Sequence, residues 1–167
     1  MRLRFVTGHD LVSRLILARE GAMAAWVKDV PSHVEMVVAE GYLGAHDDGG
    51  VQIRKIGYDL PYLAAERFVD VALPDEAAAE AFARRKIGEP YDFAAILDLA
   101  ALAPLDLHLH EHCICSALMT LVLLHGGAFA TPLGLPAHLV SPALLLFWLS
   151  GRLAIAPATP APAPAAG

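Results

Sequence analysis

The stretch Cys115-Ser116-Ala117-Leu118-Met119-Thr120-Leu121-Val122-Leu123-Leu124 is typical of a buried helix that begins at a cysteine. A thiol at a helix N-terminus faces the positive end of the helix dipole, which favours the nucleophilic thiolate. About eighty residues upstream, the strand-like stretch His33-Val34-Glu35-Met36-Val37-Val38 begins with a histidine. A histidine on a strand can act as the base for a thiol if the fold brings the two together. We therefore take Cys115 and His33 as the candidate catalytic pair, although a small buried cysteine and a structural histidine are the simpler interpretation.

The composition indicates a single domain of 167 residues, long enough to bury a hydrophobic core. The net charge of −6 and the absence of a basic tract argue against a nucleic-acid partner. Hydrophobic residues make up 56% of the chain and the mean hydropathy is +0.50, but much of this comes from alanine, which is a weak membrane signal. The composition leaves the oligomeric state open.

The cysteines and the apolar C-terminal half bear on the compartment. Cys113 and Cys115 are one residue apart, so a disulfide between them would be badly strained, and we expect free thiols in a reducing environment. The N-terminus becomes polar too early for a secretory signal. Residues 113–151 contain no Asp, Glu, Lys or Arg, but glycines and prolines divide them into pieces shorter than the ~20 residues that a spanning helix needs. The sequence thus predicts a cytoplasmic protein with no stable membrane insertion.

Hydrophobic patterning and turn residues predict both strands and helices. We expect strands at 3–6, 32–38, 41–46, 51–56 and 67–73, and helices within 9–17, 75–86, 90–103 and from 115 onward. This order predicts an α+β fold, a small antiparallel sheet with helices packed against it. Residues 1–154 would form one domain, and the Pro/Ala-rich residues 155–167 a disordered tail.

Two short motifs resemble those of a known enzyme family. Ile87-Gly88-Glu89-Pro90-Tyr91-Asp92 followed by Cys115-Ser116 is similar to the Gly-x-Pro-Tyr and Cys-Ser motifs of NlpC-type cell-wall peptidases, a branch of the papain-like superfamily. In most of these enzymes the cysteine precedes the histidine. The reverse order here resembles the circularly permuted branch, which includes YiiX/YebB-like proteins and relatives of lecithin retinol acyltransferase. Segments 8–16 and 44–51 also fit that branch, so the resemblance covers about residues 5 to 145.

The resemblance implies a circularly permuted papain-like domain that hydrolyses amide bonds through an acyl-enzyme. Cys115 would attack, and His33 would take the thiol proton and return it to the leaving amine. The Tyr91 hydroxyl would help the backbone N–H of Cys115 to bind the oxyanion. The substrates would be cell-wall peptides or related amides, and no cofactor or metal ion would be needed.

The residue that orients His33 is the point where the sequence departs from the family. Relatives place a His, Glu or Asn about a dozen residues after the base, but Gly44 and Ala45 stand there. We expect His46 to orient His33 if the turn shifts the strand register by one residue. Asp48 is the second candidate for this role. A solvent-exposed turn histidine is the other interpretation of His46. Without such a group the imidazole would be poorly oriented.

Three alternatives remain open at this level. A lipid-directed acyltransferase or lipase of the same fold would explain the apolar C-terminal half, whereas a peptidase predicts that the apolar side chains of 139–149 are buried. A binding domain with a decayed site would explain the missing orienting residue. His108, His110 and His112, followed by Cys113 and Cys115, are the alternative of a zinc site, against an exposed histidine-rich segment.

Overall fold

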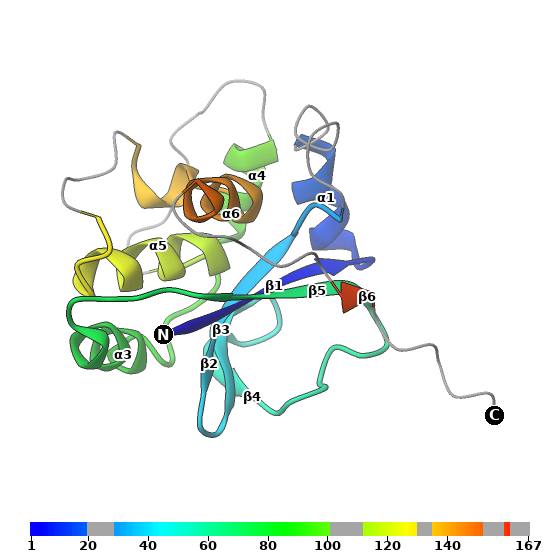
Figure 1. Ribbon diagram of the computed structural model, residues 1–167. Coiled ribbons are helices and arrows are strands. Elements are labelled where there is room, and N and C mark those ends of the chain that lie inside the picture. The colour runs from blue at the N-terminus through cyan, green and yellow to red at the C-terminus, as the bar shows by residue number, and fades with distance from the viewer. Residues whose placement is uncertain (20–28, 101–111, 130–134, 152–158, 161–167) are drawn as a thin grey trace.

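The computed structural model describes residues 1–19, 29–100, 112–129, 135–151 and 159–160 (Figure 1). The fold is α+β, as the sequence predicts. The strands are β1 (Arg2–Gly8), β2 (His33–Val38), β3 (Gly41–His46), β4 (Gly50–Arg54), β5 (Leu63–Asp70) and β6 (Thr159–Pro160). The helices are α1 (Leu11–Arg19), α3 (Glu76–Arg85), α4 (Phe93–Ala100), α5 (Cys115–His125), α6 (Pro142–Ser150) and the short 3₁₀ helix η1 (Ala137–Leu139).

The strands form one antiparallel sheet in the order β4-β3-β2-β1-β5-β6. The tight turn between β2 and β3 uses Gly41 at φ 145°, a conformation that residues with a Cβ rarely adopt. A Cβ there would also lie 2.0 Å from the Arg54 carbonyl oxygen on β4. Glycine therefore lets β3 lie close to the end of β4. The predicted strands lie in β1 to β5, but β5 begins four residues earlier and ends three residues earlier than expected.

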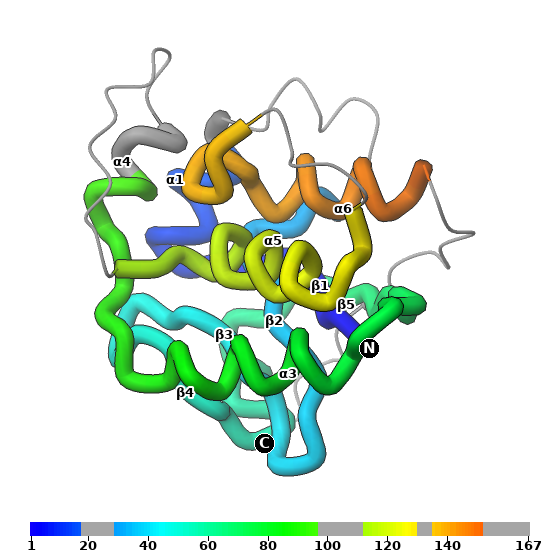
Figure 2. The backbone as a smooth tube through the Cα atoms, turned by 90° about the vertical axis from the view of Figure 1, so that its left-hand side faces the viewer, coloured from blue at the N-terminus to red at the C-terminus, as the bar shows by residue number. Residues whose placement is uncertain are grey.

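The helices α1, α4, α5 and α6 gather on one side of the sheet (Figures 1 and 2). Helix α5 lies at the centre of the core because it packs on β2 and β3 and also contacts α3, α6 and η1. Its side chains are buried almost all round, which is typical of a helix enclosed by other elements. This packing brings the N-terminus of α5, where Cys115 lies, to the side of the sheet that carries His33.

The apolar segment 139–149 folds back onto the core. Of the side chains expected to be buried, Val140 and Leu145 are buried, Leu139, Leu144 and Trp148 are half-buried, and Phe147 is exposed. The N-cap of α6 is Ser141, whose hydroxyl accepts a hydrogen bond from the Leu144 N–H. Among the described residues, no helix is both long and apolar enough to cross a bilayer.

The C-terminal segment contributes a short edge strand. Thr159 and Pro160 pair with Glu66 and Ala65 of β5, so these two residues of the predicted tail are extended. Proline cannot donate to a ladder, but it is tolerated on an edge strand such as β6. The other tail residues lie outside the described part of the chain, and the domain boundary at 154 stays a prediction.

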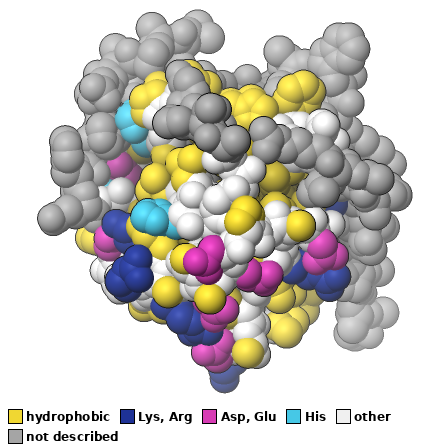
Figure 3. Space-filling view, turned by 60° about the vertical axis from the view of Figure 1, so that its left-hand side comes forward, with side chains coloured by type: hydrophobic (Ala, Val, Ile, Leu, Met, Phe, Trp, Pro, Cys, Tyr) yellow, Lys and Arg dark blue, Asp and Glu magenta, His cyan; other side chains and the backbone are white. Residues whose placement is uncertain are grey.

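The surface over α3 carries charges of both signs. Figure 3 shows acidic and basic side chains interspersed over the lower half of this face, below a mainly hydrophobic region. Arg84 of α3 contributes by pairing with Glu40 of the β2–β3 turn and with Glu80 one helical turn away. This face therefore presents no continuous field of one sign.

Candidate active site

Cys115 and His33 meet where α5 crosses β2. Cys115 is the first residue of α5, and the preceding Ile114 supplies no side-chain cap to the helix N-terminus. His33 is the first residue of β2, and its imidazole is a hydrogen-bond partner of the Cys115 thiol. The structure therefore brings together the two residues that the sequence singled out.

Glu35 orients the histidine. Its carboxylate oxygen Oε2 lies 3.3 Å from His33 Nε2, which leaves Nδ1 as the nitrogen for the thiol. The prediction that His46 orients His33 is wrong, since no hydrogen bond joins their rings and the centroids are 5.0 Å apart. The sequence did contain the signal for Glu35, because residues i and i+2 of a strand share a face. Asp48 is engaged instead with Arg54 at the turn beyond β3.

Arg4 of β1 binds the Glu35 carboxylate at the oxygen that does not contact His33. Its Nη1 donates to Glu35 Oε1 at 2.6 Å, and its Nε donates to Glu66 Oε2 at 2.6 Å. The guanidinium also contacts Asp59 at 3.0 Å and lies 4.4 Å from the centre of the Tyr42 ring. Arg4 and Glu35 are both buried, so the carboxylate is charged, fixed and directed at His33.

The surroundings of His33 favour its protonated form. Burial lowers the pKa of the imidazole, but the Cys115 thiolate and the Glu35 carboxylate outweigh burial and raise this pKa to about 10. The side chain is 18% exposed, so it stands at the border between the core and solvent. Burial also raises the pKa of Glu35, yet the hydrogen bond from His33 and the Arg4 charge leave that pKa below its usual value. A thiolate–imidazolium–carboxylate chain is the arrangement that these contacts stabilise.

His46 lies beside this chain and is neutral. Burial and the neighbouring His33 charge lower the pKa of His46 to about 3. Its Nε2 is 3.8 Å from Glu35 Oε2, and its Nδ1 is 3.4 Å from the Tyr58 hydroxyl. His46 therefore contacts the site without orienting the base.

Tyr91 lies near enough to Cys115 for the two groups to interact electrostatically. Burial and the Cys115 charge both raise the pKa of its hydroxyl, which keeps the phenol protonated as a hydrogen-bond donor. Tyr91 is held by a bridge to Cys113, in which the Cys113 N–H donates to the Pro90 carbonyl at 3.0 Å. This short bridge joins the Pro-Tyr motif to the segment that leads into α5.

A cavity of about 530 Å³ opens on the His33 side of the site. It is bordered by the end of β1, the start of α1, the end of β3 and residues 58–63. Cys115 does not line it and is only 1% exposed, so the thiol does not open into this cavity. His33 lines the cavity and also contacts the Cys115 thiol, so it connects the two.

The predicted zinc site at the histidine-rich segment is not described as a whole. His108 and His110 lie outside the described residues. His112 is described, and its Nδ1 lies 3.3 Å from the Tyr91 carbonyl oxygen. Among the described residues, the group whose ligand atoms approach one another is instead His33, Glu35 and His46.

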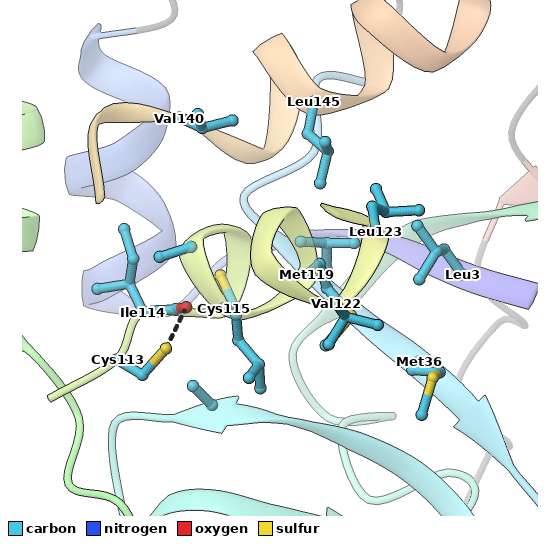
Figure 4. Packing of buried hydrophobic residues seen from close by; sticks show 14 of the residues in the cluster. Leu3, Met36, Cys113, Ile114, Cys115, Met119, Val122, Leu123, Val140 and Leu145 are labelled. Carbon is cyan, nitrogen blue, oxygen red and sulfur yellow. Dashed lines mark hydrogen bonds between the residues drawn. The ribbon is translucent and has the colours of Figure 1, made fainter. Parts of the chain in front are cut away.

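We expect Cys115 to react faster than Cys113 with iodoacetamide at neutral pH. Burial raises the pKa of Cys113 to about 12, so only a minute fraction is thiolate, whereas Cys115 faces the His33 imidazolium. The Cys113 sulfur instead approaches the Ile114 carbonyl oxygen at 3.6 Å (Figure 4). Limited labelling followed by peptide mass mapping measures both rates. Faster labelling of Cys113 would contradict the assignment of the nucleophile.

No family model, curated protein or solved structure matches this chain. Its function has to be inferred from the geometry of the site.

Proposed function

We propose that this protein is a thiol hydrolase that cleaves amide bonds through a Cys115 acyl-enzyme. The observation that carries the proposal is the contact between a cysteine at a helix N-terminus and a histidine that a buried carboxylate orients. We also propose that the domain belongs to the circularly permuted papain-like superfamily, because His33 precedes Cys115 in the chain. Cell-wall peptides and related amides are the substrate class that this kinship implies.

The proposed reaction proceeds in two steps. The Cys115 thiolate attacks the carbonyl carbon, and the tetrahedral oxyanion is bound by the Cys115 backbone N–H, free in the first turn of α5, and by the Tyr91 hydroxyl. The His33 imidazolium protonates the departing amine and becomes neutral. It then takes a proton from the water molecule that attacks the thioester, and the thiolate departs as the acid is released, which restores the thiolate–imidazolium pair. Glu35 acts as a positioning residue throughout.

One observation favours a second candidate, an acyltransferase or lipase that acts on lipids. Leu11 and Tyr62 line the cavity and are 74% and 59% exposed, so its mouth has an apolar rim. Such a rim suits an acyl chain as well as an apolar peptide side chain. The burial of most of 139–149 removes the larger apolar surface that the lipid hypothesis would use, and we therefore rank peptide amides first.

The two candidates are separated by direct assay. We expect the wild-type protein to cleave amides in a peptide set that includes cell-wall peptides, and to release no fatty acid from phosphatidylcholine vesicles. Cys115→Ala should abolish cleavage, while the matched control Cys113→Ala should retain it, because the Cys113 sulfur approaches the Ile114 carbonyl oxygen. Fatty-acid release together with sedimentation on vesicles, and no amide cleavage, would reverse the ranking. Turnover that survives Cys115→Ala would exclude both candidates.

A further inference from the structure

Three metal-binding side chains converge beside the catalytic pair. The two imidazole nitrogens of His33 and His46 and one carboxylate oxygen of Glu35 all lie within 4.8 Å of one another. Glu35 Oε2 is 3.3 Å from His33 Nε2 and 3.8 Å from His46 Nε2. Ligand atoms of a tetrahedral zinc ion, each bound at ~2.0–2.1 Å, lie roughly 3.3 Å apart. The three donors thus need only a small adjustment to enclose such an ion.

A glycine makes this convergence possible. A Cβ at Gly44 would lie 3.0 Å from Glu35 Cβ, 3.4 Å from His46 Nε2 and 3.6 Å from His33 Nε2. Any larger side chain at this position of β3 would occupy the space between the three donors. Gly44, which cannot orient a catalytic histidine, is therefore well suited to a site that is shared by two strands.

The His46 ring presents a lone pair to the cluster. His46 is 6% exposed, and its Nε2 has no hydrogen-bond partner. The Tyr58 hydroxyl donates its proton to Glu35 Oε2 at 3.1 Å, so its oxygen can only accept from His46 Nδ1–H. The network assigns the proton to Nδ1 and leaves Nε2 as an acceptor. A buried acceptor that faces a carboxylate oxygen without a proton between them is the arrangement that a cation stabilises.

The surrounding charge also favours a cation. The buried Arg4 contacts three carboxylates, those of Glu35, Asp59 and Glu66, so these three negative charges face two positive ones, Arg4 and the His33 imidazolium. Three further carboxylates line the adjacent cavity, those of Asp10, Asp47 and Asp48. Arg54 lines the same cavity and supplies a positive charge. A divalent ion at the three donors would neutralise the excess negative charge around Arg4.

We propose that His33 Nε2, Glu35 Oε2 and His46 Nε2 form a binding site for a divalent transition metal ion such as Zn²⁺. Two imidazoles and one carboxylate are a ligand set that zinc uses in proteins, and the cavity leaves the fourth position open to water. Arg4 would hold Glu35 through its other oxygen, and Tyr58 would hold the ring of His46. In this proposal the other nitrogen of His33 serves Cys115, which is not a ligand.

The site has a regulatory consequence, which rests on the proposed hydrolase function. A metal ion at Nε2 replaces the proton that His33 shares with Glu35, and this proton leaves to solvent. The remaining Nδ1 proton faces Cys115 and cannot be given up without forming an imidazolate. Metal binding and amide hydrolysis therefore exclude each other, and the metal-bound form is the inactive one.

The site is tested by titrating full-length Cys115→Ala with ZnCl₂ in a calorimeter, so that the thiol cannot contribute. We expect one equivalent to bind, and a further His46→Gln substitution to lower the affinity more than ~100-fold, which is the upper range for losing only an outer-sphere partner of a ligand. His33→Gln in the same background should do the same, and circular dichroism checks that both variants fold. The matched control His125→Ala should bind normally, because His125 stacks on Phe82 far from the site.

Two results would overturn the site. One is the absence of binding, or binding that survives both His46→Gln and His33→Gln. The other is binding that is lost in a His108→Ala/His110→Ala variant, which would assign the metal to the histidine-rich segment.

The regulatory part of the proposal is tested separately, by measuring the alkylation rate of wild-type Cys115 with ZnCl₂ or with EDTA. Zinc should slow alkylation at least tenfold in the wild type and not in His46→Gln. An unchanged alkylation rate despite zinc binding would overturn the proposed inhibition alone. If the wild-type protein hydrolyses no amide in any assay, the hydrolase proposal fails but the metal site does not.

Discussion

Arg4→Met should lower the free energy of unfolding by about 3–5 kcal/mol at pH 7.5, because it leaves Glu35 and Asp59 charged and without their buried partner. Methionine retains most of the length of the side chain, so the loss reports the charge more than the volume. Urea denaturation measures the effect. The matched control is Arg2→Met on the same strand and face, where the exposed pair with Asp70 should leave the midpoint nearly unchanged.

The pH dependence separates the charge effect from simple packing. The pKa of Glu35 is below its usual value in the folded protein, so its contribution to stability is present above the unfolded pKa and is lost as the pH falls through the folded one. Without Arg4 the pKa of Glu35 should rise, because burial alone disfavours the carboxylate. The difference between wild type and Arg4→Met should therefore shrink between pH 7.5 and pH 5. A difference that is constant over this range would indicate a packing defect.

Most of the fold follows from local sequence signals. The alternation in 51–56 and the turn residues before it predict β4, and the acidic start of 75–86 predicts α3, whose N-cap Asp75 accepts from the Ala78 N–H. The apolar run after Cys115 likewise predicts α5. These elements are specified by residues within one segment. The edge strand β6 is not, because it forms only where a two-residue segment meets β5.

The candidate site is predictable only in part, for a physical reason. Cys115 and His33 carry their own local signals, a helix start and a strand start. The orienting residue depends on which side chains share a face, whereas the prediction of His46 relied on spacing in relatives. The role of Arg4 depends on cross-strand pairing, since Arg4 lies opposite Glu35 in the ladder. The apolar run after Cys115 predicts a buried helix, but its packing against β2 and β3 depends on the rest of the chain.

His33→Ala should lower the rate of amide hydrolysis by 10²- to 10⁴-fold, the usual contribution of a general acid–base group. It should also slow the alkylation of Cys115 at pH 6.5 by at least about tenfold, since the imidazolium no longer stabilises the thiolate. The pKa of His33 is raised to about 10, above its unfolded value near 6.5. Its stabilisation of the thiolate is therefore complete below pH 6.5 and is lost as the pH rises through about 10. The ratio of wild-type to mutant alkylation rates should accordingly fall toward one near pH 10.

Glu35→Gln shows whether the carboxylate acts through the histidine. Glutamine retains an oxygen that can accept from His33 Nε2 but removes the charge that helps to raise its pKa. The pH at which the wild-type rate advantage disappears should then move downward, toward neutrality, and kcat should fall while KM changes little. A purely structural role for Glu35 would lower stability but leave this pH unchanged in the folded fraction. Superimposable alkylation profiles for wild type and His33→Ala would mean that thiol and imidazole are uncoupled, and Cys115 would then be a core residue.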